Sequence, residues 1–164
     1  MLQINNFSVG IKEKIIVDSR KREIGDGEVV GLVGESGSGK SMTALGIMGL
    51  LPHTAEVMSG EILLDSRNLL AKSAQEMRNL RGRDISMIFQ EPMTSLNPTM
   101  KVGKQLMEVF AVHSEKYLKD EAQNKVLEVL KSVGLNDSRR VFDSYPHELS
   151  GGMRQRCAIA RAFG

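Results

Sequence analysis

The sequence of 164 residues predicts an α/β fold in which a phosphate-binding loop joins a buried strand to a helix. Residues 29–33 are apolar throughout, as in a strand that is buried on both faces of a sheet. A glycine-rich stretch follows, and a helical pattern starts at Lys40. After Pro98, apolar residues recur at helical spacing up to about residue 145. A strand-rich first part and a helical second part are therefore expected.

Four further segments are typical of extended chain. They comprise residues 2–11, 15–17, 62–64 and 85–89. In the first of these the apolar alternation slips near Asn5 and Asn6, which predicts an irregular strand. The second is closed by turn residues at 25–27.

The helices are predicted from periodicity and from stop residues. The first runs from Lys40 to about Leu51, where Pro52 stops it. The helical block of residues 100–145 contains Gly134 as a C-terminal stop, and a last helix begins after Ser150.

Composition limits the class of protein. The 22 basic and 20 acidic residues leave a net charge of +2, which is too small for nucleic acid to be the main partner. One cysteine cannot form an internal disulfide, which favours a reducing compartment. No apolar run approaches the roughly 18 residues of a membrane helix, so any membrane role is expected to be peripheral. The basic triplet at residues 20–22 predicts a solvated strand face or turn.

Residues 34–41 match the phosphate-loop pattern G-x-x-x-x-G-K-[ST]. Glycines allow successive backbone N–H groups to turn towards phosphate oxygens, and the following helix N-terminus adds partial positive charge. Lys40 is expected to contact the outer phosphates, and the Ser41 hydroxyl to ligate Mg²⁺. The predicted nucleotide-binding residues of the loop are Gly34, Glu35, Ser36, Gly37, Ser38, Gly39, Lys40 and Ser41. The loop alone leaves a kinase, GTPase, helicase or transport ATPase open.

A second motif lies at residues 149–156, with the sequence LSGGMRQR. Ser150 is a natural N-cap, and Gly151 and Gly152 leave the backbone of the first helical turn bare. On these residues alone, an anion site and a capped helix with a flexible first turn are equally good interpretations.

Together with the phosphate loop, this motif resembles the signature of ATP-binding cassette (ABC) ATPases. The resemblance extends from residue 2 to residue 163 and includes Gln90, which is similar to the glutamine loop of that family. The sequence of residues 90–98, QEPMTSLNP, resembles the subfamily that serves peptide and nickel importers. The implied fold is a P-loop NTPase core with an inserted helical subdomain.

The resemblance implies a role for each matched residue. Met42 and Thr43 would complete the ATP site, with Thr43 near the α-phosphate. Gln90 would contact Mg²⁺ or the attacking water. Ser150, Gly151 and Gly152 would bind the γ-phosphate of ATP held by a second ABC subunit.

Membrane permease subunits would contact about residues 91–100, which begin with Glu91 and end with Met100. For Met93, Leu96 and Met100, the alternative to a permease contact is ordinary packing between the sheet and the helical block. The implied location is the cytoplasmic face of the cell membrane.

The family continues beyond its signature helix into a strand that ends in an acidic pair, and then to a switch histidine. Neither is found in these residues, so the chain resembles the N-terminal portion of a longer ATPase. The full-length protein is expected to be an ABC-type ATPase, and this chain alone to be inactive. Strands that lack the family's following strand as a neighbour would expose apolar side chains, such as those of residues 29–33. The expected division is a nucleotide-binding core at 1–99, a helical subdomain at 100–148 and an incomplete signature segment at 149–164.

Two other functions share these motifs. Chromosome-maintenance ATPases interrupt the domain with a long coiled coil, but the 107 residues between Ser41 and Leu149 lack sustained heptads. A nucleotide-binding regulatory module without transport is the second alternative.

Overall fold

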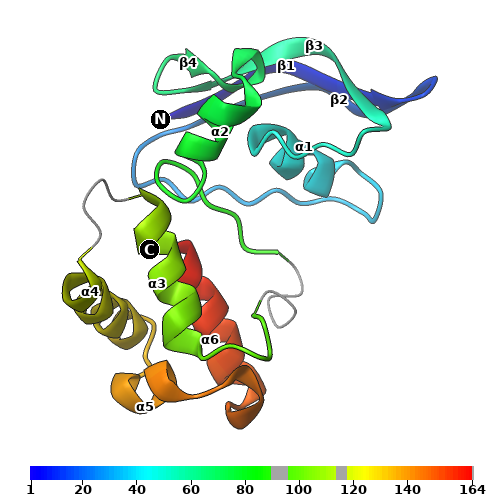
Figure 1. Ribbon diagram of the computed structural model, residues 1–164. Coiled ribbons are helices and arrows are strands. Elements are labelled where there is room, and N and C mark those ends of the chain that lie inside the picture. Colours follow the sequence, from blue (N-terminus) through cyan, green and yellow to red (C-terminus); the bar gives the residue numbers. More distant parts are fainter. Residues whose placement is uncertain (90–95, 114–117, 164) are drawn as a thin grey trace. The chain divides into compact units, whose positions relative to one another are not determined.

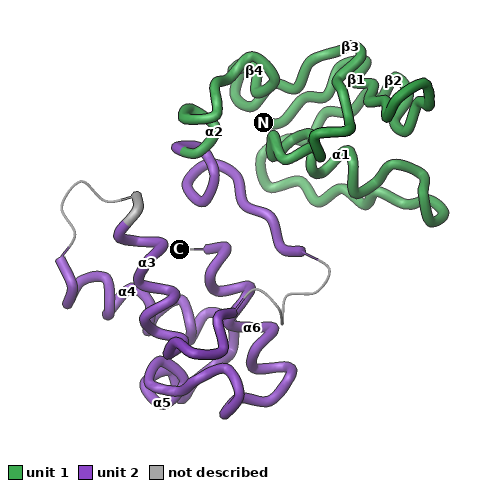
Figure 2. Tube along the Cα trace, turned by 45° about the vertical axis from the view of Figure 1, so that its right-hand side comes forward, with its two compact units in different colours: residues 1–78 green, residues 79–164 purple. Residues whose placement is uncertain are grey.

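The computed structural model describes residues 1–89, 96–113 and 118–163. The chain divides into two compact units, residues 1–78 and 79–164, and each is described here by itself (Figure 2). The first unit carries the sheet and the second carries most of the helices.

The sheet of the first unit has four strands, all paired antiparallel. They are β1 (Leu2–Ile11), β2 (Lys14–Ile24), β3 (Ala55–Leu64) and β4 (Arg67–Asn68). Their order in the sheet is β2-β1-β3-β4 (Figure 1). The strands predicted at residues 2–11, 15–17 and 62–64 are thereby confirmed.

The predicted irregularity in the first strand is confirmed as a bulge at Asn6, whose φ is 49°. Ile4 pairs with Arg22 and Phe7 pairs with Arg20, so a step of three residues on β1 faces a step of two on β2. The extra residue places Ile4 and Phe7 on the same face of the sheet. Both are buried there.

Helix α1 (Lys40–Ile47) lies against that face of the sheet (Figure 1). A Cβ built on Gly46 would lie 2.5 Å from Cζ of Phe7, so the ring packs directly on the helix backbone. The predicted end near Leu51 is wrong, because the helix ends at Ile47 and is followed by Gly49, whose φ is 61°. The Leu50 N–H donates to the Leu45 carbonyl (2.8 Å), a bond typical of a helix that ends at a glycine with positive φ. The glycine, and not Pro52, therefore terminates the helix.

The buried strand predicted at residues 29–33 is wrong for this chain. These residues form no strand, and Val29 and Val33 are 96% and 87% exposed. Among the described residues no strand runs beside them, and a backbone without a partner cannot form ladder hydrogen bonds. The apolar side chains are therefore exposed, as expected for a strand that lacks its neighbour.

The short strand predicted at residues 85–89 is likewise wrong. Only Ile85 forms a β-bridge, with Arg81, and Ile88 and Phe89 are about half exposed. The segment follows helix α2 (Ala74–Leu80), which comes after the short 3₁₀ turn η1 (Leu69–Ala71). The reason is the same: the apolar run has no described strand beside it.

The second unit is a helical cluster, as predicted. Its helices are α3 (Val102–His113), α4 (Lys119–Ser132), α5 (Ser138–Asp143) and α6 (Gly151–Ala162), with the 3₁₀ turn η3 (Pro146–Glu148) before α6. The predicted stop at Gly134 is confirmed. The Gly134 N–H donates to the Lys131 carbonyl, and the Leu135 N–H donates to the Leu130 carbonyl. The buried core consists of Leu96, Val102, Leu106, Val126, Leu130, Leu135, Val141, Leu149, Cys157 and Ala160. Within the described part of the chain, no helix is both long and apolar enough to cross a bilayer.

Candidate nucleotide-binding site

Gly39 of the phosphate loop is the N-cap of α1 and has a φ of 82°. A Cβ at this position would lie 2.7 Å from the Ile16 carbonyl oxygen and 2.9 Å from Cγ2 of Val17. Only glycine combines this left-handed backbone with so close an approach to β2. The loop is thus seated on β2 at the point where α1 begins.

The ammonium group of Lys40 lies inside the curl of the loop. Its Nζ donates to the carbonyl oxygens of Gly34 (2.8 Å) and Glu35 (2.6 Å) and to Oγ of Ser38 (3.3 Å). The Lys40 ammonium group therefore bonds to three residues of the loop at once. The loop is largely exposed from Gly34 to Gly37, so this charge is accessible to an anion.

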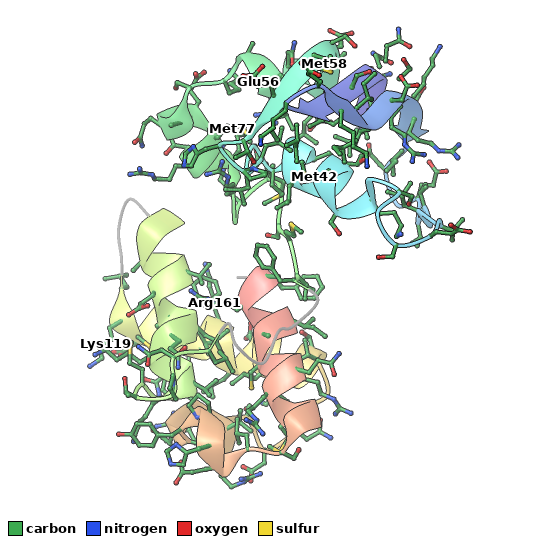
Figure 3. All side chains as sticks on the ribbon, turned by 90° about the vertical axis from the view of Figure 1, so that its right-hand side faces the viewer. Met42, Glu56, Met58, Met77, Lys119 and Arg161 are labelled. Carbon is green, nitrogen blue, oxygen red and sulfur yellow. The ribbon has the colours of Figure 1, made fainter. Side chains whose placement is uncertain are left out.

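The first turn of α1 presents three side chains with different surroundings. Ser41 is exposed, and Met42 is half-buried on the helix (Figure 3). Thr43 is buried, and its hydroxyl donates to the Gly39 carbonyl (2.9 Å). The Ser41 hydroxyl is thus available as a ligand, whereas the Thr43 hydroxyl is already bonded to the loop backbone.

Arg20 also contacts the loop, which the sequence analysis missed. Its Nη2 donates to the Ser38 carbonyl at 3.1 Å. The predicted solvated face is confirmed for Lys21 and Arg22, which are exposed, but is wrong for the half-buried Arg20. A bulge at Ser19 causes the difference, and its signal in the sequence is weak, because nothing distinguishes Ser19 from an ordinary strand residue.

The two cations at the loop are not held in ion pairs, although the loop itself contains one acidic residue, Glu35. None of the ion pairs within the described residues includes Lys40 or Arg20. The first turn of α1 contains no acidic residue, so the partial positive charge of the helix N-terminus adds to the two cations. The arrangement favours binding of a polyanion such as a triphosphate.

The signature segment lies in the second unit, at the start of α6. Ser150 is its N-cap, and Oγ accepts a hydrogen bond from the Met153 N–H (3.3 Å). A Cβ built on Gly152 meets no atom within 4 Å, so the fold itself does not require glycine there. The bare first turn is exposed at Ser150 and Gly152, which keeps the interpretation as an anion site open.

The helical core holds α6 in place. Leu149, Cys157 and Ala160 are buried in that core. Arg156 donates to the Gly134 carbonyl (3.1 Å), which ties α6 to the end of α4. The neighbouring Arg154 has a buried Nε without a hydrogen-bond partner in the described part of the chain.

The predicted glutamine-loop residue Gln90 lies outside the described residues, as do Glu91 and Met93. Of the described positions that follow, Leu96 belongs to the helical core and is 4% exposed. For Leu96, the structure therefore shows ordinary packing in the core. Met100 is half-buried, and its carbonyl accepts a hydrogen bond from the buried Gln105 amide (2.8 Å).

Comparisons with known proteins agree with this arrangement. Residues 18–164 match the ABC transporter family. The oligopeptide transport ATP-binding protein AppD of Bacillus subtilis is 44% identical over 99% of this chain. The dipeptide transport ATP-binding protein DppD of Haemophilus influenzae is 43% identical over 99%. The chain spans 51% and 50% of these two relatives, or about half of their length.

Solved structures show the same fold. The dimeric structure of a bacterial ABC transporter cassette superposes with a TM-score of 0.83 and 28% identity, covering 99% of this chain and 68% of that one. A component of an ABC transporter complex from Clostridium perfringens gives a TM-score of 0.78 and 25% identity, covering 98% of this chain and 60% of that one. With a phosphate loop, a glycine-bearing signature helix and a family match over most of its length, the chain belongs to the ABC transporter family and has the ABC ATPase fold.

Proposed function

We propose that the full-length protein is the ATP-binding, energy-coupling subunit of an ABC importer for peptides. The observation that carries this proposal is the phosphate loop itself, in which Lys40 and the N-terminus of α1 converge and Lys40 forms no ion pair within the described residues. The named relatives are dipeptide and oligopeptide transport proteins, which favours peptides over nickel as the transported substrate.

ATP would bind with its phosphates in the loop. Backbone N–H groups of residues 34–39 would donate to phosphate oxygens, and Lys40 would exchange its loop carbonyls for the outer phosphates. Mg²⁺ prefers oxygen ligands, and the exposed Ser41 hydroxyl at the helix start fits that preference. When bound, Mg²⁺ neutralises charge on the phosphates. Met42 and Thr43 complete the proposed site, with Thr43 acting through the Gly39 backbone that it holds.

The signature segment would act on a second subunit. Ser150 and the first-turn N–H groups at Gly151 and Gly152 would bind the γ-phosphate of ATP in the facing subunit. The open space around Gly152 supports this, because a phosphate must approach the backbone closely there. ATP would thereby close two subunits on each other. A similar cassette has been solved as a dimer.

Permease contact is proposed for about residues 91–100, with Gln90 linking it to the nucleotide. In the described part, Leu96 is buried and Asn97, Pro98 and Thr99 are exposed, so the contact surface would include these three but not Leu96. The subunit would then lie at the cytoplasmic face of the membrane. We also propose that residues 1–99, 100–148 and 149–164 act as the nucleotide-binding, helical and signature segments of the subunit.

The test is ATP binding by the Lys40→Ala variant of the full-length protein, measured by calorimetry. Loss of hydrogen bonds from a charged donor is expected to weaken binding by about tenfold or more. Lys14→Ala, which removes an exposed lysine of β2, is the matched control and is expected to bind normally. Equal affinities for Lys40→Ala and the wild type would refute the proposed ATP site.

A further inference from the structure

Arg20 is a second cation that contacts the phosphate loop. We propose that Arg20 is a positioning residue for nucleotide binding: it orients the Ser38–Gly39 peptide and adds positive charge beside the triphosphate. The inference rests on the proposed ATP-binding function and assigns a role to a residue outside the loop motif. It is carried by the bond from Nη2 of Arg20 to the Ser38 carbonyl (3.1 Å).

A strand bulge turns Arg20 towards the loop. Val9 pairs with Val17 and Phe7 pairs with Arg20, so two residues on β1 face three on β2. The extra residue is accommodated at Ser19, whose φ is 41° and whose N–H donates to the buried Ser8 hydroxyl (2.9 Å). In a regular strand Arg20 would face away from Val17, but the bulge puts both on one face.

That face is the one on which the loop is seated. Val17 is buried there against Gly39, and Arg20 reaches the carbonyl of the preceding residue, Ser38. The guanidinium therefore acts on the last peptide unit of the loop before α1 begins. Its half-buried position makes this bond less screened by water than one at an exposed site.

The planarity of the peptide bond gives this contact a consequence for phosphate binding. In a trans peptide the carbonyl and the N–H of the next residue point in opposite directions, and the chain contains no cis peptide among the described residues. When Arg20 holds the Ser38 carbonyl, the Gly39 N–H is directed to the opposite side of the peptide. A charged donor on the carbonyl also polarises the peptide, which makes that N–H a stronger donor.

The charge of Arg20 is not otherwise used. A guanidinium carries five N–H donors, and the bond to Ser38 is the only hydrogen bond of the Arg20 guanidinium found within the described residues. No carboxylate there pairs with it. Its charge adds to that of Lys40 and of the α1 N-terminus, which favours a bound polyanion.

The experiment compares Arg20→Met, Arg20→Lys and the control Lys21→Met in the full-length ATPase. Methionine keeps the apolar stem of Arg20 but removes the charge and the donors. For Arg20→Met we expect the KM for ATP to rise about tenfold while kcat changes less than about twofold. Arg20→Lys restores a charged donor and is expected to recover most of the affinity. Lys21→Met removes an exposed charge from the same strand and is expected to leave KM unchanged.

Unfolding of each variant without nucleotide provides the structural control. An unchanged KM for Arg20→Met overturns the inference, as does a parallel loss of kcat, stability and affinity that Arg20→Lys does not recover. If ATP binding by the wild type depends on Lys40 but Arg20→Met has a normal KM, the role of Arg20 is refuted and the proposed function stands. A wild type that shows no Lys40-dependent ATP binding refutes the proposed function, and the role of Arg20 with it.

Discussion

At the scale of single residues, Cys157 shows how burial controls reactivity. Its side chain is fully buried in the helical core, and burial raises the pKa of the thiol from 9.0 to about 11. A thiol with that pKa holds about 100-fold less thiolate at pH 8 than an exposed one. We expect a disulfide reagent to modify the folded chain very slowly and the urea-unfolded chain rapidly. Cys157→Ser gives the background, and rapid stoichiometric labelling of the folded chain would contradict the expectation.

Glu76 is the residue whose titration bears on stability. Its carboxylate accepts hydrogen bonds from Lys72 (2.8 Å) and from the N–H (2.9 Å) and hydroxyl (2.8 Å) of Ser73, and these lower its pKa from 4.5 to about 2. The folded state therefore favours the charged form. The stabilisation is complete above about pH 4.5 and is lost as the pH falls to about 2.

We accordingly expect Glu76→Gln to lower the free energy of unfolding at pH 7 and to have a smaller effect near pH 2.5. Denaturant titrations of both proteins at several pH values measure the difference. Glu56→Gln, at an exposed position of β3, serves as the control (Figure 3). A difference that does not change with pH would show that the bonds of Glu76 do not depend on its charge.

At the scale of elements, α6 separates the demands of folding from those of function. The space around Gly152 is open, and alanine is a better helix former than glycine. We expect Gly152→Ala to keep or raise the free energy of unfolding, by up to about 0.5–1 kcal/mol. In the full-length protein it should nevertheless reduce ATP-dependent dimerisation, because the added methyl group occupies the approach to the first-turn N–H groups.

Denaturant unfolding and light scattering with ATP measure these two effects. Gly46→Ala is the contrasting variant, because its Cβ would lie 2.5 Å from the Phe7 ring and is expected to destabilise the first unit. If Gly152→Ala dimerises with ATP as the wild type does, the proposed role of the signature backbone is wrong.

At the scale of the whole molecule, we expect the 164-residue chain to release no phosphate from ATP above background. Hydrolysis requires a phosphate cradle, a held metal ion and an acid that orients the attacking water. The chain supplies the cradle and Ser41, whereas the acidic strand end of the family is not found in its sequence. Phosphate release is compared with that of the Lys40→Ala chain. Turnover well above this control would mean that Asp65, Glu91 or another acid takes the role.

The exposed segment at residues 29–33 gives the same chain a second property. Val29 and Val33 are almost fully exposed, and an unpaired apolar backbone is a template for pairing with another chain. We expect the 164-residue chain to self-associate, as measured by light scattering against concentration. Val29→Lys and Val33→Lys together should reduce the association, and a strictly monomeric wild-type chain would contradict the expectation.

The sequence by itself determined the features that depend on neighbouring residues. The stop at Gly134 and the N-cap at Ser150 are local hydrogen-bonding arrangements, so their residues predict them directly. The strand at residues 2–11, with its slip at Asn6, follows from alternation along a single strand. The phosphate-loop pattern is equally local, because its glycines, Lys40 and Ser41 lie within eight residues of one another.

Only the tertiary structure decided the features that need a partner distant in sequence. Residues 29–33 have the composition of a buried strand, but a strand exists only when another backbone satisfies its N–H and C=O groups, and no described strand does so. Arg20 has the appearance of a solvated residue within a basic triplet, yet the register against β1 and the bulge at Ser19 turn it towards the loop. A one-residue change of register exchanges the two faces of a strand, so side-chain direction along β2 is set by pairing and not by composition.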